Sequence, residues 1–183
     1  MFFSLAGCPK KEPKIAGQKS SDPKGGPAWV GRCAGAFPDS SKRAFYGCGA
    51  AAGINNEPFE IASADERSRV DLAKNIDYFV ASFLTDFMAS PSIKPKAKLE
   101  ESERKQFISD LTRHVTETTL YGSQVLDRWR SPDGTRYALS KVSFESMEEN
   151  LRRLMAECAP SINLDPEWDI DELNRQMEIK RSD

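Results

Sequence analysis

One long amphipathic stretch, residues 59–88, limits the folds that this chain can adopt. Its apolar residues recur every three or four positions, which is the period of an α-helix. A helix of that length measures roughly 45 Å at 1.5 Å per residue, so the rest of the fold must be arranged along it. Turn and capping residues at 55–58 predict where it begins, and Pro91 and Pro95 predict that it has ended. We expect its apolar stripe to lie in the core: Val70, Ala73, Ile76, Phe79, Val80, Phe83, Leu84 and Phe87.

Shorter segments supply the other predicted elements. Four of them have the composition of β-strands: residues 27–37, 44–51, 124–129 and 136–142. A Ser-Pro-Asp-Gly turn at 131–134 separates the last two, which predicts a β-hairpin. The remaining helical patterns are those of residues 99–120, 144–158 and, more weakly, 170–177.

The order of these elements predicts the fold class. Strands do not alternate with helices, which disfavours a doubly wound parallel sheet. We therefore expect a single α+β domain over residues 27–158, with a four-stranded antiparallel sheet and the long helices packed on one face. Residues 159–183 are expected to form an acidic C-terminal tail with the weak helix. A chain of 183 residues is long enough for one such domain with a sizeable core.

The N-terminus carries a short motif of a different kind. Residues 5–8, Leu-Ala-Gly-Cys, resemble a bacterial lipobox, in which an export signal is cut just before a cysteine that then carries lipid. We therefore assign residues 1–8 to a signal remnant and predict lipid attachment at Cys8. The segment before Cys8 lacks Lys and Arg and is shorter than a usual export signal, so we expect the true start codon upstream. The alternative is a frayed apolar N-terminus of a cytosolic protein.

Residues 9–26 have the composition of a disordered tether. They are rich in Pro, Gly and Lys and hold almost no large apolar side chain, so burial cannot offset the entropy of ordering them. No run approaches the ~18 apolar residues of a spanning helix, so membrane attachment is expected through Cys8. Pro9, rather than Asp, follows that cysteine, which favours sorting to the outer membrane. The net charge of -2 gives no reason to expect nucleic acid as a partner.

The other cysteines allow two interpretations. With Cys8 lipidated, Cys33, Cys48 and Cys158 remain. In an oxidising compartment we expect a Cys33–Cys48 disulfide, because both residues lie in neighbouring predicted strands. The alternative, equally weighted, is that all three are small buried hydrophobic residues.

Motifs for catalysis and cofactors are weak. Residues 47–52 fit the dinucleotide pattern G-x-G-x-x-A, but residues 53–58 separate them from the next helix, whose N-terminus should begin within the glycine turn. We expect instead small residues where a helix crosses a sheet, and keep a dinucleotide-binding oxidoreductase as a remote alternative. His114 is the only histidine, so a site with two or three histidines is impossible. We predict no metal, no cofactor and no catalysis.

An ordered set of short motifs resembles a known family. The motifs lie at residues 27–30, 44–51, 78–82, 119–122 and 137–139, with the Trp129 hairpin among them. Together they are similar to the lipoprotein family named after the twenty-kilodalton Helicobacter membrane-associated lipoprotein, and the N-terminal domain of flagellar assembly protein T looks related. The resemblance covers about residues 27–154. It implies a cell-envelope lipoprotein with a small α+β domain and no established activity.

These features together predict a membrane-anchored interaction or assembly factor that docks to a partner in the cell envelope. The alternative is a structural lipoprotein that self-associates. We expect Trp29 to be buried core. Because Trp and Arg are enriched at interface hot spots, the predicted partner-binding residues are those near the hairpin tip: Arg128, Trp129, Arg130 and Arg136.

Overall fold

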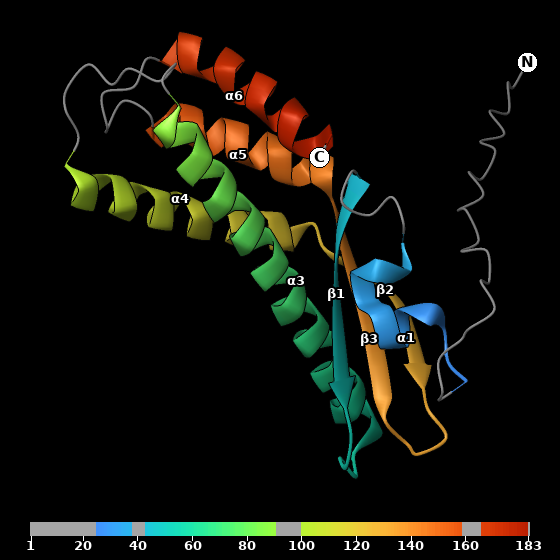
Figure 1. Ribbon diagram of the computed structural model, residues 1–183. Helices are drawn as coiled ribbons and strands as arrows, with labels where there is room; N and C mark the ends of the chain where they lie inside the picture. Colours follow the sequence, from blue (N-terminus) through green and yellow to red (C-terminus); the bar gives the residue numbers. More distant parts are fainter. Residues whose placement is uncertain (1–24, 38–42, 91–99, 159–165, 183) are drawn as a thin grey trace, which may run out of the picture.

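The computed structural model describes residues 25–37, 43–90, 100–158 and 166–182 (Figure 1). Its class is α+β, as predicted, and its sheet is antiparallel. The prediction of four strands is wrong, because the sheet has three strands in the order β1-β3-β2. The elements are α1 (Ala28–Arg32), η1 (Cys33–Ala36), β1 (Ala44–Ala51), α3 (Glu57–Ala89), α4 (Glu101–Tyr121), β2 (Gln124–Arg130), β3 (Arg136–Ser143), α5 (Phe144–Cys158) and α6 (Pro166–Ser182).

The predicted first strand, residues 27–37, is a short helix followed by a 3₁₀ turn. Pro27 begins α1 by accepting a hydrogen bond from the Val30 amide at 3.0 Å. Cys33, with φ +46°, ends it. A short apolar run fits a strand or a buried helix equally well by period alone. Here the run lies across the sheet instead of joining its edge, and it buries Trp29.

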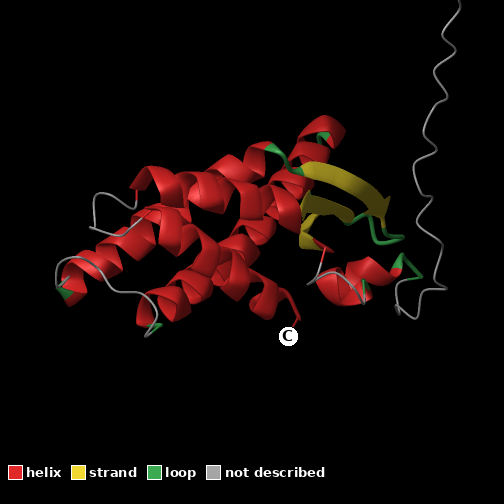
Figure 2. Ribbon diagram, turned by 90° about the horizontal axis from the view of Figure 1, so that it is seen from above, coloured by secondary structure: helices red, strands yellow, loops and turns green. Residues whose placement is uncertain are grey.

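The sheet separates two unequal layers (Figure 2). Helix α3 crosses one face, whereas α1 and η1 cover the other through contacts of Trp29 with Leu139 and its neighbours. The prediction placed the long helices together on one face. Instead, α4, α5 and α6 gather around the second half of α3, beyond the end of the sheet (Figure 1).

Glycines in β1 let α3 approach the strand closely. A Cβ at Gly47 would lie 2.2 Å from the Leu72 amide nitrogen, and one at Gly49 would lie 2.3 Å from the Ala64 carbonyl oxygen. Only hydrogen fits at these positions. The expectation of small residues where a helix crosses a sheet is therefore confirmed, and helix backbone fills the space that a bound pyrophosphate would need beside the two glycines.

Polar side chains of α3 also satisfy the outer edge of β1. Arg67 donates to the Ala50 carbonyl at 2.5 Å, Asp71 accepts from the Cys48 amide at 2.9 Å, and Asn75 donates to the Tyr46 carbonyl at 2.9 Å. The three helix residues are four positions apart, a rise of about 6 Å, and the three strand residues are two positions apart, a rise of about 6.6 Å. The helix and strand groups therefore stay aligned along the whole contact. Because an open strand edge invites pairing with another chain, this ladder protects β1.

The core of the helical half lies between α3, α4, α5 and the C-terminal helix. Phe144, where β3 passes into α5, stacks on Phe45 and meets Phe79 edge-on. Leu173 and Met177 of α6 are buried in the same cluster, so the packed fold continues past residue 158. Most of the predicted α3 stripe is buried or half-buried, but Val70 is 49% exposed and that prediction is wrong.

Candidate functional site

The predicted partner-binding arginines lie on the hairpin formed by β2 and β3, facing α3. Arg128 forms a bidentate pair with Asp65, at 2.8 and 2.7 Å. This hydrogen bonding raises the pKa of the Arg128 guanidinium. Asp65 belongs to the first half of α3, so the pair joins the hairpin to the long helix.

Arg130 and Arg136 bind two further carboxylates of α3. Arg136 donates to Glu57 at 2.6 Å, and its Nε lies 3.7 Å from the Glu60 carboxylate. Arg130 lies 3.9 Å from the same carboxylate. Glu60 is only 3% exposed, and buried charges generally require partners. The arginines therefore neutralise the start of α3, which lowers their value as an open cationic docking patch.

Trp129 is also engaged within the chain. Its ring lies 5.6 Å from that of Tyr137 and covers Gly26, where an added Cβ would lie 2.9 Å from the indole. Gly26, at the end of the predicted tether, is buried. Trp29 is 4% exposed, as predicted for core, and its indole donates to Asp127 at 2.9 Å. The hairpin thus holds the point where the chain enters the fold.

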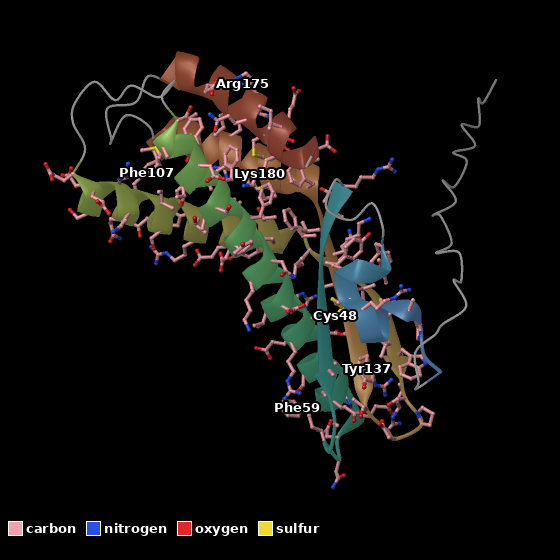
Figure 3. The ribbon with its side chains drawn as sticks, viewed as in Figure 1. Cys48, Phe59, Phe107, Tyr137, Arg175 and Lys180 are labelled. Atoms are coloured by element: carbon pink, nitrogen blue, oxygen red, sulfur yellow. A yellow bond between two sulfur atoms is a disulfide. The ribbon has the colours of Figure 1, made fainter. Side chains whose placement is uncertain are left out.

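A disulfide joins Cys33 to Cys48, with their Cα atoms 5.8 Å apart. This is the pair that the first of the two cysteine interpretations favours. It links η1 to β1 on the sheet face that α1 covers, and Figure 3 shows Cys48 and Tyr137 on this part of the sheet. Beside it, Phe37 stacks on Tyr46 with ring centroids 4.2 Å apart. Burial raises the pKa of the Tyr46 hydroxyl.

A groove with a volume of about 980 Å³ lies between α3 and α4. We call it the α3–α4 groove. Its α3 wall is a stripe of small or short side chains four residues apart, and its lining is mainly apolar. The α3 wall consists of Ala73, Asp77, Ala81, Thr85 and Ala89, and the α4 wall includes Ile108, Ser109, Thr112, Thr116 and Leu120.

Hydroxyl groups lie along the floor of this groove. Thr116 donates to Asp77 at 2.5 Å, which ties the two helices together. Thr112 is 7% exposed, and its hydroxyl has no hydrogen-bond partner among the residues that the structure describes. A buried hydroxyl without a partner costs about 1–3 kcal/mol relative to one that is hydrogen-bonded. The Thr112 oxygen itself has almost no accessible surface, so it lies beneath the groove lining.

Charged side chains form the rim of the groove. At the start of α4 lie Glu101, Arg104 and Lys105, and at the opposite end lie Asp77 and Glu117. Lys105 pairs with Glu101 at 2.7 Å, and this hydrogen bond lowers the pKa of the Glu101 carboxyl. Arg113 lines the α4 wall between Lys105 and Glu117, so positive and negative side chains are mixed along the groove.

This groove was not predicted from the sequence. Ala73 was expected in the core of α3, but it lines the groove wall. A second stripe was available in the sequence, because residues 73, 77, 81, 85 and 89 are all short and four apart. Such a stripe indicates a face that another helix can approach, but it does not say whether that face is covered.

Two further predictions concern catalytic and anchoring residues. His114 is exposed on α4, and Glu117, one turn away, lines the groove rim. Within the described ranges, no three His, Cys, Asp or Glu side chains converge to hold a metal ion.

None of the helices in the described ranges is both long enough and apolar enough to cross a membrane. Cys8 and the predicted tether up to residue 24 lie outside the described residues.

Comparison with known protein families and curated proteins found no match to this chain. The resemblance to the lipoprotein family therefore stays a prediction.

Proposed function

We propose that this chain is a membrane-anchored lipoprotein of the cell envelope, held by lipid on Cys8, that acts as a non-catalytic interaction and assembly factor. Two parts of the molecule support the proposal. The N-terminal lipobox and tether supply the attachment, and the α3–α4 groove supplies a docking surface on the folded domain. The proposed location is the outer membrane.

The Cys33–Cys48 disulfide is the observation that carries this proposal. Disulfides persist in secreted and envelope proteins and are rare in the cytosol. This one closes a loop of 15 residues, for which loop-closure entropy gives about 3 kcal/mol of stabilisation. Only α1 separates Cys33 from the predicted tether, so the disulfide joins to β1 the part of the fold nearest the proposed anchor.

The tether and groove together fit a docking role. If residues 9–26 form the predicted tether, a chain of that length would span roughly 20–25 Å on average, which would keep the domain close to the membrane and let it reorient. The groove lies between α4 and the second half of α3, whereas Gly26 packs against Trp129 of β2. An anchored domain could therefore present the groove away from its point of attachment.

Lipid attachment is expected to depend on one side chain. Cells that express this chain from its native locus should incorporate an alkyne analogue of palmitate into it, and Cys8→Ser should abolish the label. Cys158→Ser is the matched control and should keep it, because Cys158 lies at the far end of α5. In-gel fluorescence after click chemistry measures the result. A wild-type chain without label, or a label that survives Cys8→Ser, contradicts the proposal.

A further inference from the structure

We propose that Asp71 of α3 controls which thiols can open the Cys33–Cys48 disulfide, and that it disfavours reductants that carry extra negative charge. The inference goes beyond the proposed function, because it assigns a selective role in thiol–disulfide exchange to one carboxylate of the fold. It concerns the folded, oxidised chain and does not depend on lipid at Cys8.

The Asp71 carboxylate lies beside the disulfide. Its Oδ2 atom is 3.9 Å from the Cys33 Sγ atom. The same oxygen accepts a hydrogen bond from the Cys48 amide at 2.9 Å, which holds the carboxylate in this position. The Cys48 Sγ atom lies 3.9 Å from the Trp29 carbonyl oxygen. Each sulfur atom therefore faces an oxygen that carries full or partial negative charge.

The other charged groups near Asp71 do not cancel this effect at the sulfur atoms. Asp71 and Cys48 line a pocket of about 550 Å³ at the outer edge of β1. Three further charged side chains line it: Glu66, Arg67 and Lys74. Arg67 donates to the Ala50 carbonyl, and no described Lys or Arg forms an ion pair with Asp71. The charge closest to the disulfide is therefore the carboxylate.

Opening a disulfide brings negative charge to its sulfur atoms. A reductant thiolate bonds to one sulfur, the S–S bond breaks, and the other sulfur leaves as a thiolate that takes a proton from water. A second reductant thiolate then displaces the first cysteine from the mixed disulfide, so two reductant thiols become one disulfide and both cysteines become thiols.

Both directions of attack meet the same carboxylate. Attack at Cys48 expels a thiolate at Cys33, whose sulfur is 3.9 Å from Asp71 Oδ2. Attack at Cys33 brings the incoming anion to that oxygen instead. Like charges at short range disfavour the charged form, so Asp71 slows either route. A reductant with a second negative charge is slowed further, whereas a positive charge beside its thiolate offsets the repulsion.

Three small thiols of different charge test the proposal on the purified chain. Thioglycolate carries a carboxylate, 2-mercaptoethanol is otherwise neutral, and cysteamine carries an ammonium group. Cys8→Ser and Cys158→Ser leave Cys33 and Cys48 as the only cysteines. Quenching with N-ethylmaleimide, followed by mass spectrometry, gives the fraction of reduced chain with time.

Asp71→Asn removes the charge and keeps an oxygen that can accept from the Cys48 amide. It should raise the rate with thioglycolate roughly fivefold or more, the effect of one unit charge at about 4 Å in water. The increase should be smaller with 2-mercaptoethanol and smallest with cysteamine. Each rate is compared with the wild-type rate for the same thiol, so differences in intrinsic reactivity cancel.

Asp86→Asn is the matched control, because it removes the same charge about 22 Å farther along α3. It should leave all three rates unchanged. In 1 M salt, where the Debye length is about 3 Å, the differences between thiols should largely disappear from the Asp71→Asn comparison.

Lys74→Glu keeps the proposal testable if Asp71→Asn fails to fold, because Lys74 is exposed and lies one turn from Asp71. The new carboxylate should slow thioglycolate roughly twofold to threefold more than cysteamine, as expected for an exposed charge. Equal acceleration of all three thiols by Asp71→Asn at low and high salt would indicate a loosened fold and overturn the proposal. Rates that neither variant changes would also overturn it.

Discussion

Gly47→Ala is expected to lower the free energy of unfolding by about 4 kcal/mol or more, above the usual cost of overpacking a core. The added methyl group would lie 2.2 Å from the Leu72 nitrogen, 2.3 Å from the Ser68 carbonyl oxygen and 2.6 Å from the Leu72 Cα. All three are backbone atoms, so no side-chain rotation can relieve the clash. Strand β1 and helix α3 would have to separate, which would also strain the Asp71 contact with Cys48.

Chemical denaturation monitored by circular dichroism measures this effect. Gly35→Ala is the matched control, because its nearest neighbour to an added Cβ would be the Arg32 Cβ at 3.9 Å, an ordinary contact. That variant should stay within about 0.5 kcal/mol of the wild type. Equal stabilities for Gly47→Ala and Gly35→Ala would show that α3 does not cross β1 as closely as described.

Phe144→Ala is expected to lower the free energy of unfolding by about 4 kcal/mol, within the range for removing a buried phenylalanine. Phe144 is 1% exposed and lies at the junction of β3 and α5. Its ring contacts Phe45 of β1 and Phe79 of α3, with centroid separations of 5.7 and 5.3 Å. The vacated space would therefore border the sheet, the long helix and α5 together, and no single element could move to fill it.

Phe59→Ala provides the comparison for the same chemical change on the surface. Phe59 is 63% exposed in the first turn of α3 (Figure 3), so its truncation should change the free energy of unfolding by no more than about 0.5 kcal/mol. Linear extrapolation of urea unfolding curves gives both values. Similar losses in the two variants would mean that Phe144 is not the junction of the core.

The parts of the fold that the sequence predicted were those with a local cause. The three-to-four spacing of apolar residues located α3, and the Ser-Pro-Asp-Gly turn located the hairpin, because both signals come from neighbours in the chain. Residues 27–37 have no such signal. Their helical conformation follows from contacts of Trp29 with Asp127 and of Cys33 with Cys48, which join residues far apart in sequence.

The candidate site shows the same limit. The clustering of arginines near the hairpin tip was visible in the sequence, but their partners, Asp65, Glu57 and Glu60, come from the start of α3. Only the paired sheet brings them together. The α3–α4 groove depends on how two helices lie beside each other, and hydrophobic period does not determine this. The contact residues predicted from the sequence therefore lie on the hairpin, and the α3–α4 groove was not predicted.

A count of reactive thiols in the full chain, taken directly from cells, tests the central claim of an anchored, oxidised envelope protein. Cells are lysed in denaturant with a polyethylene-glycol maleimide, so that each thiol adds a resolvable mass on a non-reducing gel. Of the four cysteines, Cys8 should be blocked by lipid, and Cys33 and Cys48 by their disulfide, while Cys158 retains a thiol. The account predicts one added mass, and none after Cys158→Ser. Two added masses would contradict the lipid anchor, three would contradict the disulfide, and four would place a reduced, unlipidated chain in the cytosol.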